Sequence, residues 1–454
     1  MQKLWHKGYS LGPEAEAYCF GDTVELDNKL VKFDALGSIA HAKMLDKISI
    51  LEPGEFVQLK KSLQEIIELA KNGKFKVQFG DEDVHTKIEN YLIEKLGEPG
   101  KKIHTGRSRN DQVLTDLRLY TKENLFSIAM ADLDLAKTFL GFAKKYEFVP
   151  MPGYTHMQKA MPSSLGMWAS SFAESLLDDI ELLKAAFVHN DQSVLGSAAA
   201  YGVALPLDRE LTAEFLGFAK VQNNSLYAQV SRGKSHLSVM NALVQIMLSL
   251  SRFAQDLLLF TTSEFSFLTI DERLCTGSSI MPQKKNLDIM EVLRARTHIV
   301  ISQQQAVGSI IAGLPSGYNT DFGETKKPFM ESLETTLESL KLCKLVVESI
   351  VPNIKVLEEA CTPELYATRV TFELVKKGLP FREAYQKVSL SAANQSTYDK
   401  TKALKVSKHT GGTGNLGLSK IEVSLAKDEK WWKSKQDIYV KAINNLTGEK
   451  NYED

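Results

Sequence analysis

Five long segments with helical periodicity constrain the fold of this chain more than any other feature of its sequence. Apolar residues recur in them at spacings of three and four, as in helices, over residues 112–147, 162–190, 228–263, 286–312 and 328–351. Several of these segments are apolar on more than one face, and a helix that is apolar all round must be buried on all sides. A single chain of 454 residues cannot hold five such helices at its centre. The pattern predicts a helical bundle extended by identical chains, with a monomer of one thick core as the alternative.

The rest of the chain forms smaller regions on either side of this bundle. We expect an N-terminal helical domain at residues 1–108, a central long-helix bundle at 109–356 and a small C-terminal helical domain at 357–454. In the last region, "TPELYAT" and "GLPFREAY" predict short helices. The segment 149–164 carries three prolines and a glycine, so we expect a loop there that ends by starting a helix.

The composition excludes several classes of function. The chain has 55 Lys and Arg against 56 Asp and Glu, so its net charge of -1 gives no overall attraction to nucleic acid or an anionic membrane. The four cysteines are scattered without a CxxC pair, which argues against a zinc knuckle or a disulfide framework and fits a reducing compartment. The start of the chain lacks the apolar run of a signal peptide. We therefore expect a soluble, cytoplasmic protein without nucleic-acid or membrane partners.

The stretch "HTGRSRNDQ", residues 104–112, gathers hydrogen-bond donors just before a long amphipathic pattern. Unpaired backbone N–H groups and the helix dipole favour an anion at a helix N-terminus. Ser108, Arg109 and Asn110 are therefore candidates for binding a carboxylate. The alternative is a capped, solvated helix start with Arg109 in a surface salt bridge.

The stretch "GYTHMQ", residues 153–158, places His156 between Thr155 and Gln158. Histidine is the side chain best suited to exchange protons near neutral pH. A histidine in a loop of this kind is otherwise an ordinary surface residue, so a catalytic role requires a partner.

The stretch "TGSSIMPQKKN", residues 276–286, combines small residues, hydroxyls, an amide and lysines. Ser278, Ser279, Lys284 and Asn286 are the residue types that a carboxylate site collects. The alternative for "PQKKN" is an exposed basic turn, which leaves the preceding glycine and serines unexplained.

Glu291 follows this stretch, within the first turns of the expected helix from about residue 286. We expect it to face inward with Val292 and Ala295, where a buried acid requires a partner and would keep a histidine oriented and basic. A fourth stretch, "GYNTDFGETKKP" at 317–328, includes Tyr318 and Lys326 but taken alone would be a solvated polar loop.

Together these clusters predict a site that binds a dicarboxylate and holds a serine, a histidine and a glutamate for proton transfer. This set of groups indicates elimination chemistry. Removing a proton beside a carboxylate creates a doubly charged aci-carboxylate, which preorganised donors and cations must stabilise.

The same residues carry a family resemblance that covers most of the chain. "GSSIMPQKKN" is similar to the GSSxMPxKxN signature of the fumarase/aspartase superfamily, and "HTGRSRNDQVLTDLRLY" and "PGYTHMQKAMP" resemble its argininosuccinate lyase branch, which includes the delta-crystallins. The resemblance implies a mainly α, three-domain subunit and a homotetramer, whose core of 20 helices is five from each of four chains. It further implies active sites drawn from three subunits, no cofactor or metal, and release of fumarate and arginine from argininosuccinate in arginine biosynthesis.

The resemblance also implies roles for individual residues. Ser278 is expected to be the general base, and His156, supported by Glu291, the acid or relay toward the departing nitrogen. Lys284 and Asn286 would stabilise the aci-carboxylate. The expected substrate-binding residues are Thr23, Ser108, Arg109, Asn110, Thr155, Gln158, Ser279, Asn286, Tyr318 and Lys326.

Several positions depart from the family pattern. The usual "WGGRF" is "WHKGY" at 5–9, "SDRD" is "SRGK" at 231–234, and a proline after the signature asparagine is Leu287. A glutamine expected between Tyr318 and Lys326 is Gly323. These positions are expected near the end of the substrate away from the cleaved bond. They leave open a related lyase acting on another N-linked succinyl adduct, and a catalytically silent structural homologue.

Overall fold

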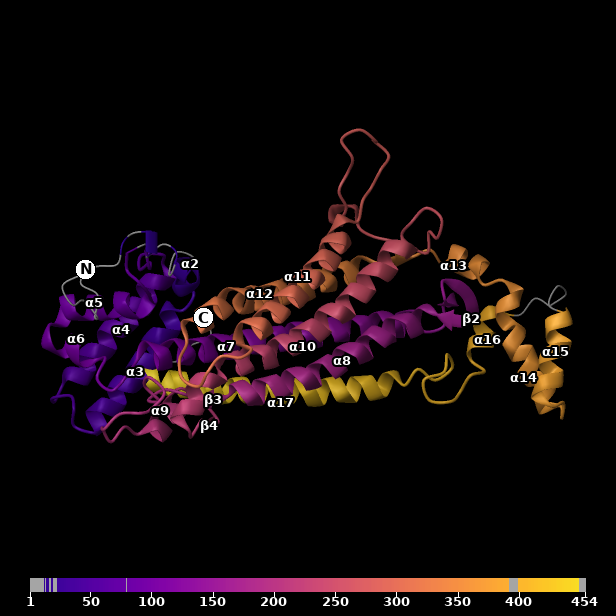
Figure 1. The fold of residues 1–454 in the computed structure, drawn as a ribbon. Coiled ribbons are helices and arrows are strands. Elements are labelled where there is room, and N and C mark those ends of the chain that lie inside the picture. The colour runs from indigo at the N-terminus through magenta and orange to yellow at the C-terminus, as the bar shows by residue number, and fades with distance from the viewer. Residues whose placement is uncertain are drawn as a thin grey trace.

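The computed structural model describes residues 12, 14, 15, 18, 23–78, 80–391 and 399–448. The departure at 5–9 and the side chain of Thr23 lie outside what is described. The molecule is elongated and mainly helical, with long helices running side by side along its length (Figure 1). This confirms the predicted fold class of the subunit.

Five long helices form the central bundle, as the periodicity predicts. They are α7 (Arg109–Lys145), α8 (Leu165–Asn190), α10 (Ser225–Phe260), α11 (Asp288–Ile311) and α12 (Lys326–Ser349). Aromatic rings fill the contact between α7, α8 and α10: the ring of Phe253 lies 5.1 Å from that of Phe139 and 5.5 Å from that of Phe172. Edge-to-face pairs of this kind add to the burial of large apolar surfaces, so they hold the bundle together.

Helix α10 is long and apolar enough to cross a membrane, and it is the one such helix in the part of the chain that the structure describes. Half of its apolar window is buried inside the subunit. It packs against α8, α11 and α12, which is the arrangement of a core helix.

The N-terminal unit lies at one end of the bundle. Its helices are α2 (Thr23–Asn28), α3 (Val31–Lys47), α4 (Glu55–Lys71), α5 (Val84–Leu96) and α6 (Glu98–Lys102). Helix α3 is buried along most of its length, including the polar residues Asp34, Ser38 and His41. Gly97 ends α5 with a φ of 71°, as the glycine stop predicts.

The segment 149–164 is a two-stranded antiparallel hairpin, which corrects the predicted loop. Strand β1 (Pro150–Thr155) pairs with β2 (Gln158–Ser164), and Pro152 lies opposite Pro162. A two-stranded ribbon has only edge strands, so prolines are tolerated where their missing N–H would face outward. The prediction that the segment leads into a helix is confirmed, because Ser164 caps α8 with its side chain, accepting from Met167 N at 3.0 Å.

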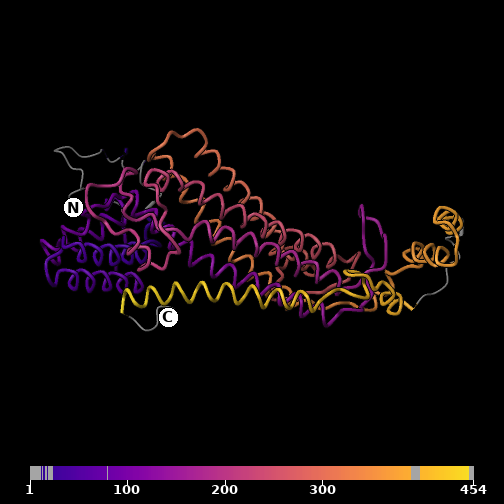
Figure 2. The backbone as a smooth tube through the Cα atoms, turned by 90° about the horizontal axis from the view of Figure 1, so that it is seen from below, coloured from indigo at the N-terminus to yellow at the C-terminus, as the bar shows by residue number. Residues whose placement is uncertain are grey.

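The C-terminal region contains a long helix that the sequence reading missed. Helix α17 (Leu418–Thr447) runs back along the bundle beside α7 and α8 (Figures 1 and 2). Its buried residue Trp432 packs edge-on against Phe126 of α7 and Phe187 of α8. The predicted short helices are present earlier in the region. The division into three domains stays a prediction, since α17 belongs to the third by sequence but packs along the second.

The remaining elements are short and connect these units. The helical ones are α9 (Arg209–Phe215), η1 (Glu272–Leu274), η2 (Thr320–Thr325), α13 (Ile354–Ala360), η3 (Pro363–Tyr366), α14 (Ala367–Lys376), α15 (Phe381–Ser391) and α16 (Lys400–Leu404). Two small sheets pair β3 (Gln192–Ser193) with β4 (Lys220–Val221) and β5 (Leu268–Thr269) with β6 (Val351–Pro352).

Candidate active site

The first predicted cluster lies at the N-terminus of α7. Ser108 is the N-cap: its Oγ accepts from the backbone N–H of Asn110 at 3.3 Å, and its own N–H donates to Asp111 Oδ1 at 2.9 Å. Asp111 Oδ2 also accepts from the N–H groups of Gly196 and Ala198 at 2.9 and 3.0 Å. This capping box fixes the start of the helix rigidly. Ser108 and Asn110 stay half-buried beside it.

Arg109 is paired inside the subunit. Its Nη1 and Nη2 form a two-point ion pair with Glu82, Nη2 donates to Thr86 Oγ1 at 3.1 Å, and Nε lies 3.4 Å from Asp83. Burial lowers the pKa of Arg109, but the hydrogen bonds that it donates to Glu82 and the charge of Asp83 outweigh burial, so the pKa is raised. Within one subunit, Arg109 thus acts mainly as a member of an ion pair at a capped helix start. The role of Arg109 as a carboxylate ligand stays a prediction.

The second cluster forms the tip of the hairpin. Thr155, His156 and Gln158 are all exposed. His156 and Met157 make the turn between the strands, with φ values of 54° and 61°. Two consecutive positive φ values are the signature of a type I′ turn, which glycine and asparagine adopt far more readily than histidine and methionine. The imidazole is thus presented outward, beside a methionine side chain that is 68% exposed.

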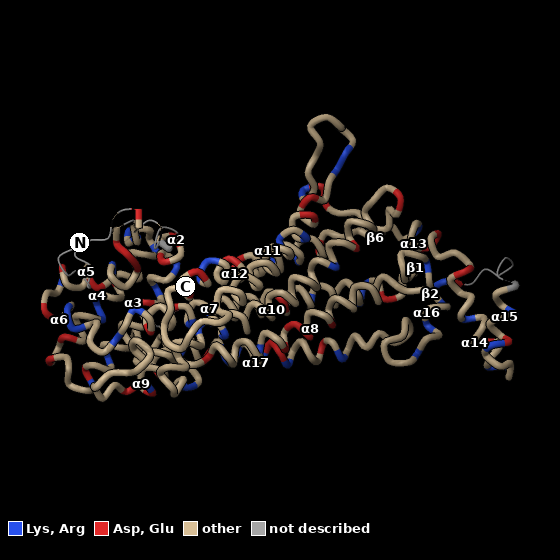
Figure 3. The backbone as a smooth tube through the Cα atoms, viewed as in Figure 1, with Lys and Arg blue, Asp and Glu red and all other residues tan. Residues whose placement is uncertain are grey.

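The third cluster is a loop that protrudes from the bundle (Figures 1 and 3). Reciprocal backbone hydrogen bonds of 2.8 and 2.9 Å between Thr276 and Asn286 close its base. Ser278 Oγ accepts from the N–H groups of Met281 at 3.1 Å and Ile280 at 3.4 Å. Ser279 and Lys284 are exposed, and Ile280 is 83% exposed.

Glu291 is exposed, which corrects the prediction that it faces inward with Val292 and Ala295. The inward face of α11 is instead formed by Leu293, Thr297 and Val300, and Thr297 Oγ1 donates to the carbonyl oxygen of Met247 on α10 at 3.1 Å. The inward residues recur four and three apart, so Glu291 falls on the opposite face of the helix.

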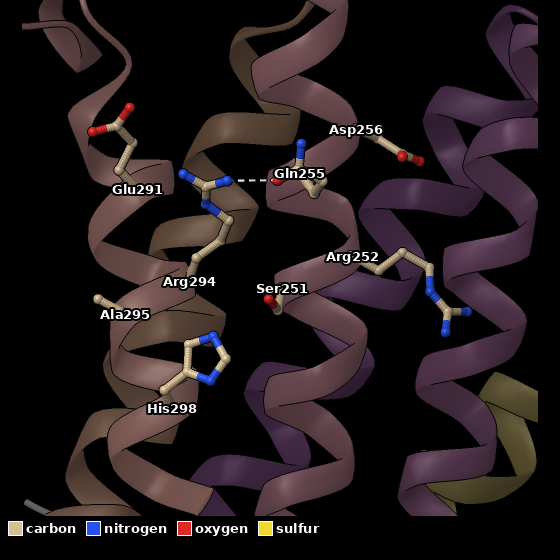
Figure 4. Close-up of a pocket in the computed structure, with 8 residues that line it drawn as sticks. All are labelled: Ser251, Arg252, Gln255, Asp256, Glu291, Arg294, Ala295 and His298. Atoms are coloured by element: carbon tan, nitrogen blue, oxygen red, sulfur yellow. Dashed lines mark hydrogen bonds between the residues drawn. The ribbon is translucent and has the colours of Figure 1, made fainter. Parts of the chain in front are cut away.

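Glu291 lines an open groove of about 670 Å³ between α10 and α11 (Figure 4). Arg294 crosses this groove and donates to Gln255 at 2.5 Å, and His298 stands further along α11 (Figure 4). The groove is lined by Glu291 and, two turns further along the same helix, by His298, and His156 is not among its lining residues.

The fourth cluster joins the N-terminal unit to α12. Lys326 Nζ forms a buried ion pair with Asp27 Oδ1 at 2.5 Å, and Asp27 Oδ2 accepts from the N–H of Val84 at 3.1 Å. Tyr318 is 40% exposed nearby in the sequence. Asp27 thus connects Lys326 to Val84 at the start of α5. The residue before Val84 is Asp83, which pairs with Arg109 of the first cluster. Lys326 and the first cluster therefore lie at the same end of the molecule.

One subunit does not bring the predicted site residues together. Ser108 begins α7, and the hairpin carrying His156 follows the end of that helix, so the 37 residues of α7 separate them. At 1.5 Å per residue this is about 55 Å. Figure 1 shows α2 and α5 at one end of the molecule and β2 at the other, with the protruding loop between them. A single subunit therefore holds these predicted site residues far apart.

Sequence reasoning missed a buried charged cluster between the N-terminal unit and α7. His85 Nδ1 hydrogen-bonds Asp34, and Asp116 Oδ2 lies 3.7 Å from the same nitrogen. Burial alone would lower the pKa of His85, but Asp34, Asp83 and Asp116 outweigh it and raise the pKa to about 9. Burial raises the pKa of Asp116 well above its usual range, and the charge of Asp34 adds to this effect.

The ligand atoms of this cluster lie within 4.8 Å of one another, a spacing that could hold a metal ion. The cluster already contains positive charge: His85 hydrogen-bonds Asp34, and the charge of Arg107 acts on Asp116. These two cations balance the two carboxylates. The sequence signal was an acid or histidine at positions where the helical pattern requires an apolar residue.

Comparison with known proteins identifies the class to which this fold belongs. The family model described as "Lyase" matches residues 17–301, which include the first three clusters. The solved structure of an EDDS lyase in complex with formate superimposes with a TM-score of 0.81 at 20% identity, covering 98% of this chain and 96% of that one. The protein is a carbon–nitrogen lyase with the fold of the fumarase/aspartase superfamily.

Curated relatives identify the branch. The argininosuccinate lyase of Thermotoga neapolitana is 42% identical over 388 residues, which are 86% of this chain and 98% of that protein. The argininosuccinate lyase of Phocaeicola vulgatus is 40% identical over 93% of this chain and 94% of its own length. The chain belongs to the argininosuccinate lyase family.

Proposed function

We propose that the protein catalyses the reversible elimination of argininosuccinate to L-arginine and fumarate, a step of arginine biosynthesis. The observation that carries this proposal is the identity of about 40% to argininosuccinate lyases over nearly their whole length. A solved EDDS lyase variant of the same fold holds bound fumarate, which is the product expected here.

In the proposed reaction Ser278 takes a proton from the carbon beside a succinyl carboxylate, and the carbon–nitrogen bond then breaks. Serine is a weak base unless its alkoxide is stabilised. The backbone N–H groups of Met281 and Ile280 already donate to Ser278 Oγ, at 3.1 and 3.4 Å, and would stabilise that charge. Lys284 and Asn286 on the same loop would stabilise the aci-carboxylate intermediate.

The departing guanidinium nitrogen takes a proton from His156, directly or through a relay that includes Glu291. The exposed hairpin tip can present His156 to a neighbouring subunit, and the exposed Glu291 is likewise available to another chain. The carboxylates of the substrate would be held by Thr23, Ser108, Arg109, Asn110, Thr155, Gln158, Ser279, Asn286, Tyr318 and Lys326. Arg109 would have to exchange part of its ion pair with Glu82 for substrate.

The working form is a homotetramer with sites shared between subunits. The outward face of α11 supports this, because an exposed stripe of small and apolar residues runs along it at spacings of three and four: Val292, Ala295, Ile299, Ser302 and Ala306. A stripe with this period is the contact surface of a helical bundle. The three-domain subunit and a cytoplasmic location complete the proposal.

A related lyase acting on another N-linked succinyl adduct is the second candidate. Gly323 favours it: a Cβ at this position would meet no heavy atom within 4 Å, so the space that a glutamine would occupy is open. An open space of this kind would accept a differently shaped leaving group.

The test is the absorbance of fumarate formed when purified protein meets argininosuccinate. We expect turnover in the wild type, loss of at least about a thousandfold in Ser278→Ala, and full activity in Ser434→Ala, an exposed serine on α17. Full turnover in Ser278→Ala would remove that serine from the mechanism. A folded wild type without turnover would favour another succinyl adduct, and the absence of fumarate from any adduct would indicate a catalytically silent homologue.

A further inference from the structure

Arg232 is a buried cation without a partner. It lies on α10 with 4% of its surface exposed. Its guanidinium forms no hydrogen bond or ion pair with any residue that the structure describes, and its Nε is enclosed without an acceptor. Burial lowers the pKa of Arg232, and only Tyr318 and Asp27 lie close enough to oppose this effect. An enclosed arginine in this state is costly, because buried charges are normally paired.

A second buried arginine on the neighbouring helix shows the usual arrangement. Arg118 on α7 donates to the carbonyl oxygens of His189 and Asn190, at 3.3 and 3.1 Å. It also donates to Gln222 Oε1 at 3.1 Å and Ser231 Oγ at 3.0 Å. Neutral acceptors therefore satisfy both Nη atoms of Arg118, although its Nε is enclosed without an acceptor, whereas Arg232, the residue after Ser231, has no acceptor at all among the described residues.

The charges around Arg232 do not balance. Asp27 is the nearby acid, but its carboxylate is already bound to Lys326 and to the N–H of Val84. His236, one turn further along α10, is neutral and adds no charge: burial, Arg232 and Arg118 hold its pKa well below the usual range. Two cations, Arg232 and Lys326, thus face one carboxylate, which leaves one unit of positive charge for an anion.

We propose that Arg232 binds the carboxylate of the amino-acid half of the substrate. This inference rests on the proposed function, in which the substrate carries three carboxylates. The two on the succinyl half meet the loop at 276–286 and the clusters around Ser108 and His156. The third belongs to the departing amino acid and is assigned to the region of Tyr318 and Lys326. Lys326 contributes to that region, but its charge is already balanced by Asp27, so Arg232 supplies the positive charge that is not yet balanced.

The surroundings of Arg232 fit this ligand. A guanidinium can bind a carboxylate through two parallel hydrogen bonds, which a lysine cannot do. Tyr318, whose charge reaches Arg232, is 40% exposed. Gly323, in η2 between Tyr318 and Lys326, leaves open space around a Cβ position.

The experiment compares Arg232→Met and Arg232→Lys with Arg252→Met, which removes an exposed arginine from the same helix. The readouts are kcat and KM for argininosuccinate, and inhibition by each product separately. In Arg232→Met we expect inhibition by L-arginine to weaken by about 10- to 100-fold, the usual effect of losing a hydrogen-bonded charge. KM should rise similarly, with kcat and inhibition by fumarate almost unchanged. Arg232→Lys should recover part of the loss, and Arg252→Met should match the wild type.

Agmatine, which is arginine without its carboxylate, isolates the contact. The wild type should bind L-arginine much more tightly than agmatine, and Arg232→Met should bind the two equally. Unchanged inhibition by L-arginine in Arg232→Met, or an equal loss for fumarate and arginine, would overturn the inference.

The failure of the proposed function is distinguishable from the failure of this inference. A wild type that releases no fumarate from argininosuccinate contradicts the proposed function. The shift of Tm caused by L-arginine and by agmatine then tests Arg232 without turnover. A shift by arginine alone that disappears in Arg232→Met supports the inference, and the absence of any such difference overturns it. The Tm of Arg232→Met without ligand should not fall, because the variant removes an uncompensated buried charge.

Discussion

Lys326 and Asp27 form a buried ion pair of 2.5 Å although 299 residues separate them in the chain. The pair joins the first described helix of the N-terminal unit to the start of α12. Both side chains are almost fully enclosed, with 7% and 3% of their surfaces exposed. The charge of Asp27 in this junction also reaches the unpaired Arg232.

Breaking this pair should strongly destabilise the protein. Asp27→Asn leaves the ammonium of Lys326 buried without a counter-charge, so we expect the free energy of unfolding to fall by about 3–5 kcal/mol. Urea denaturation at fixed protein concentration measures it. Lys29→Met is the control, because it breaks the ion pair between Lys29 and Glu334, whose two side chains are 36% and 38% exposed. This variant should lower the free energy of unfolding by less than about 1 kcal/mol. Equal losses in the two variants would contradict the prediction.

His85 should make stability depend on pH in the alkaline range. Its pKa is raised from the ordinary 6.5 to about 9 in the folded protein, so the folded state holds a proton that the unfolded state releases. The stabilisation is complete below about pH 6.5 and is lost as the pH rises through 9. The loss is on the order of 3 kcal/mol. Denaturation at a series of pH values should show this fall in the wild type and a much flatter profile in His85→Gln; identical profiles would rule out His85 as the source.

The exposed stripe on α11 should control assembly. Ile299 is 52% exposed in the subunit, and an aspartate there would bury a charge in the proposed contact between chains. Ile299→Asp should therefore shift the molecular mass from tetramer toward smaller species in sedimentation experiments. Val423→Asp changes an apolar residue of α17 that is 70% exposed and should leave the mass unchanged. A tetramer that persists in Ile299→Asp would place the interface elsewhere.

Mixing inactive subunits should restore activity. Asn110→Ala and His156→Asn lie at opposite ends of α7, about 55 Å apart. If the sites are shared between chains, dissociating and reassembling the two variants together gives some sites that are intact. We expect fumarate release well above that of either variant alone. A mixture of His156→Asn with Gln158→Ala, both on one hairpin tip, should stay inactive, and equal results from the two mixtures would argue against shared sites.

Local sequence was sufficient for much of the fold. The periodicity of the five long segments located α7, α8, α10, α11 and α12, because the spacing of apolar residues reflects helix geometry directly. Ser108 was found in the same way, since capping is an interaction within four residues. The hairpin at 149–164 was missed because its prolines and glycine indicate a break in helix without indicating strand pairing.

The tertiary structure decided which face of each helix lies inward. The sequence could not tell that Glu291 is exposed, since apolar residues flank it on a helix with an outward apolar stripe. It could not tell that Arg232 is buried without a partner, or that Asp34 meets His85, because burial and pairing depend on neighbours distant in the chain. The sequence by itself determined the five long helices of the bundle and the chemical types at the site. Only the packing of distant segments decided which charges are paired, since the cost of a buried charge depends on every group around it.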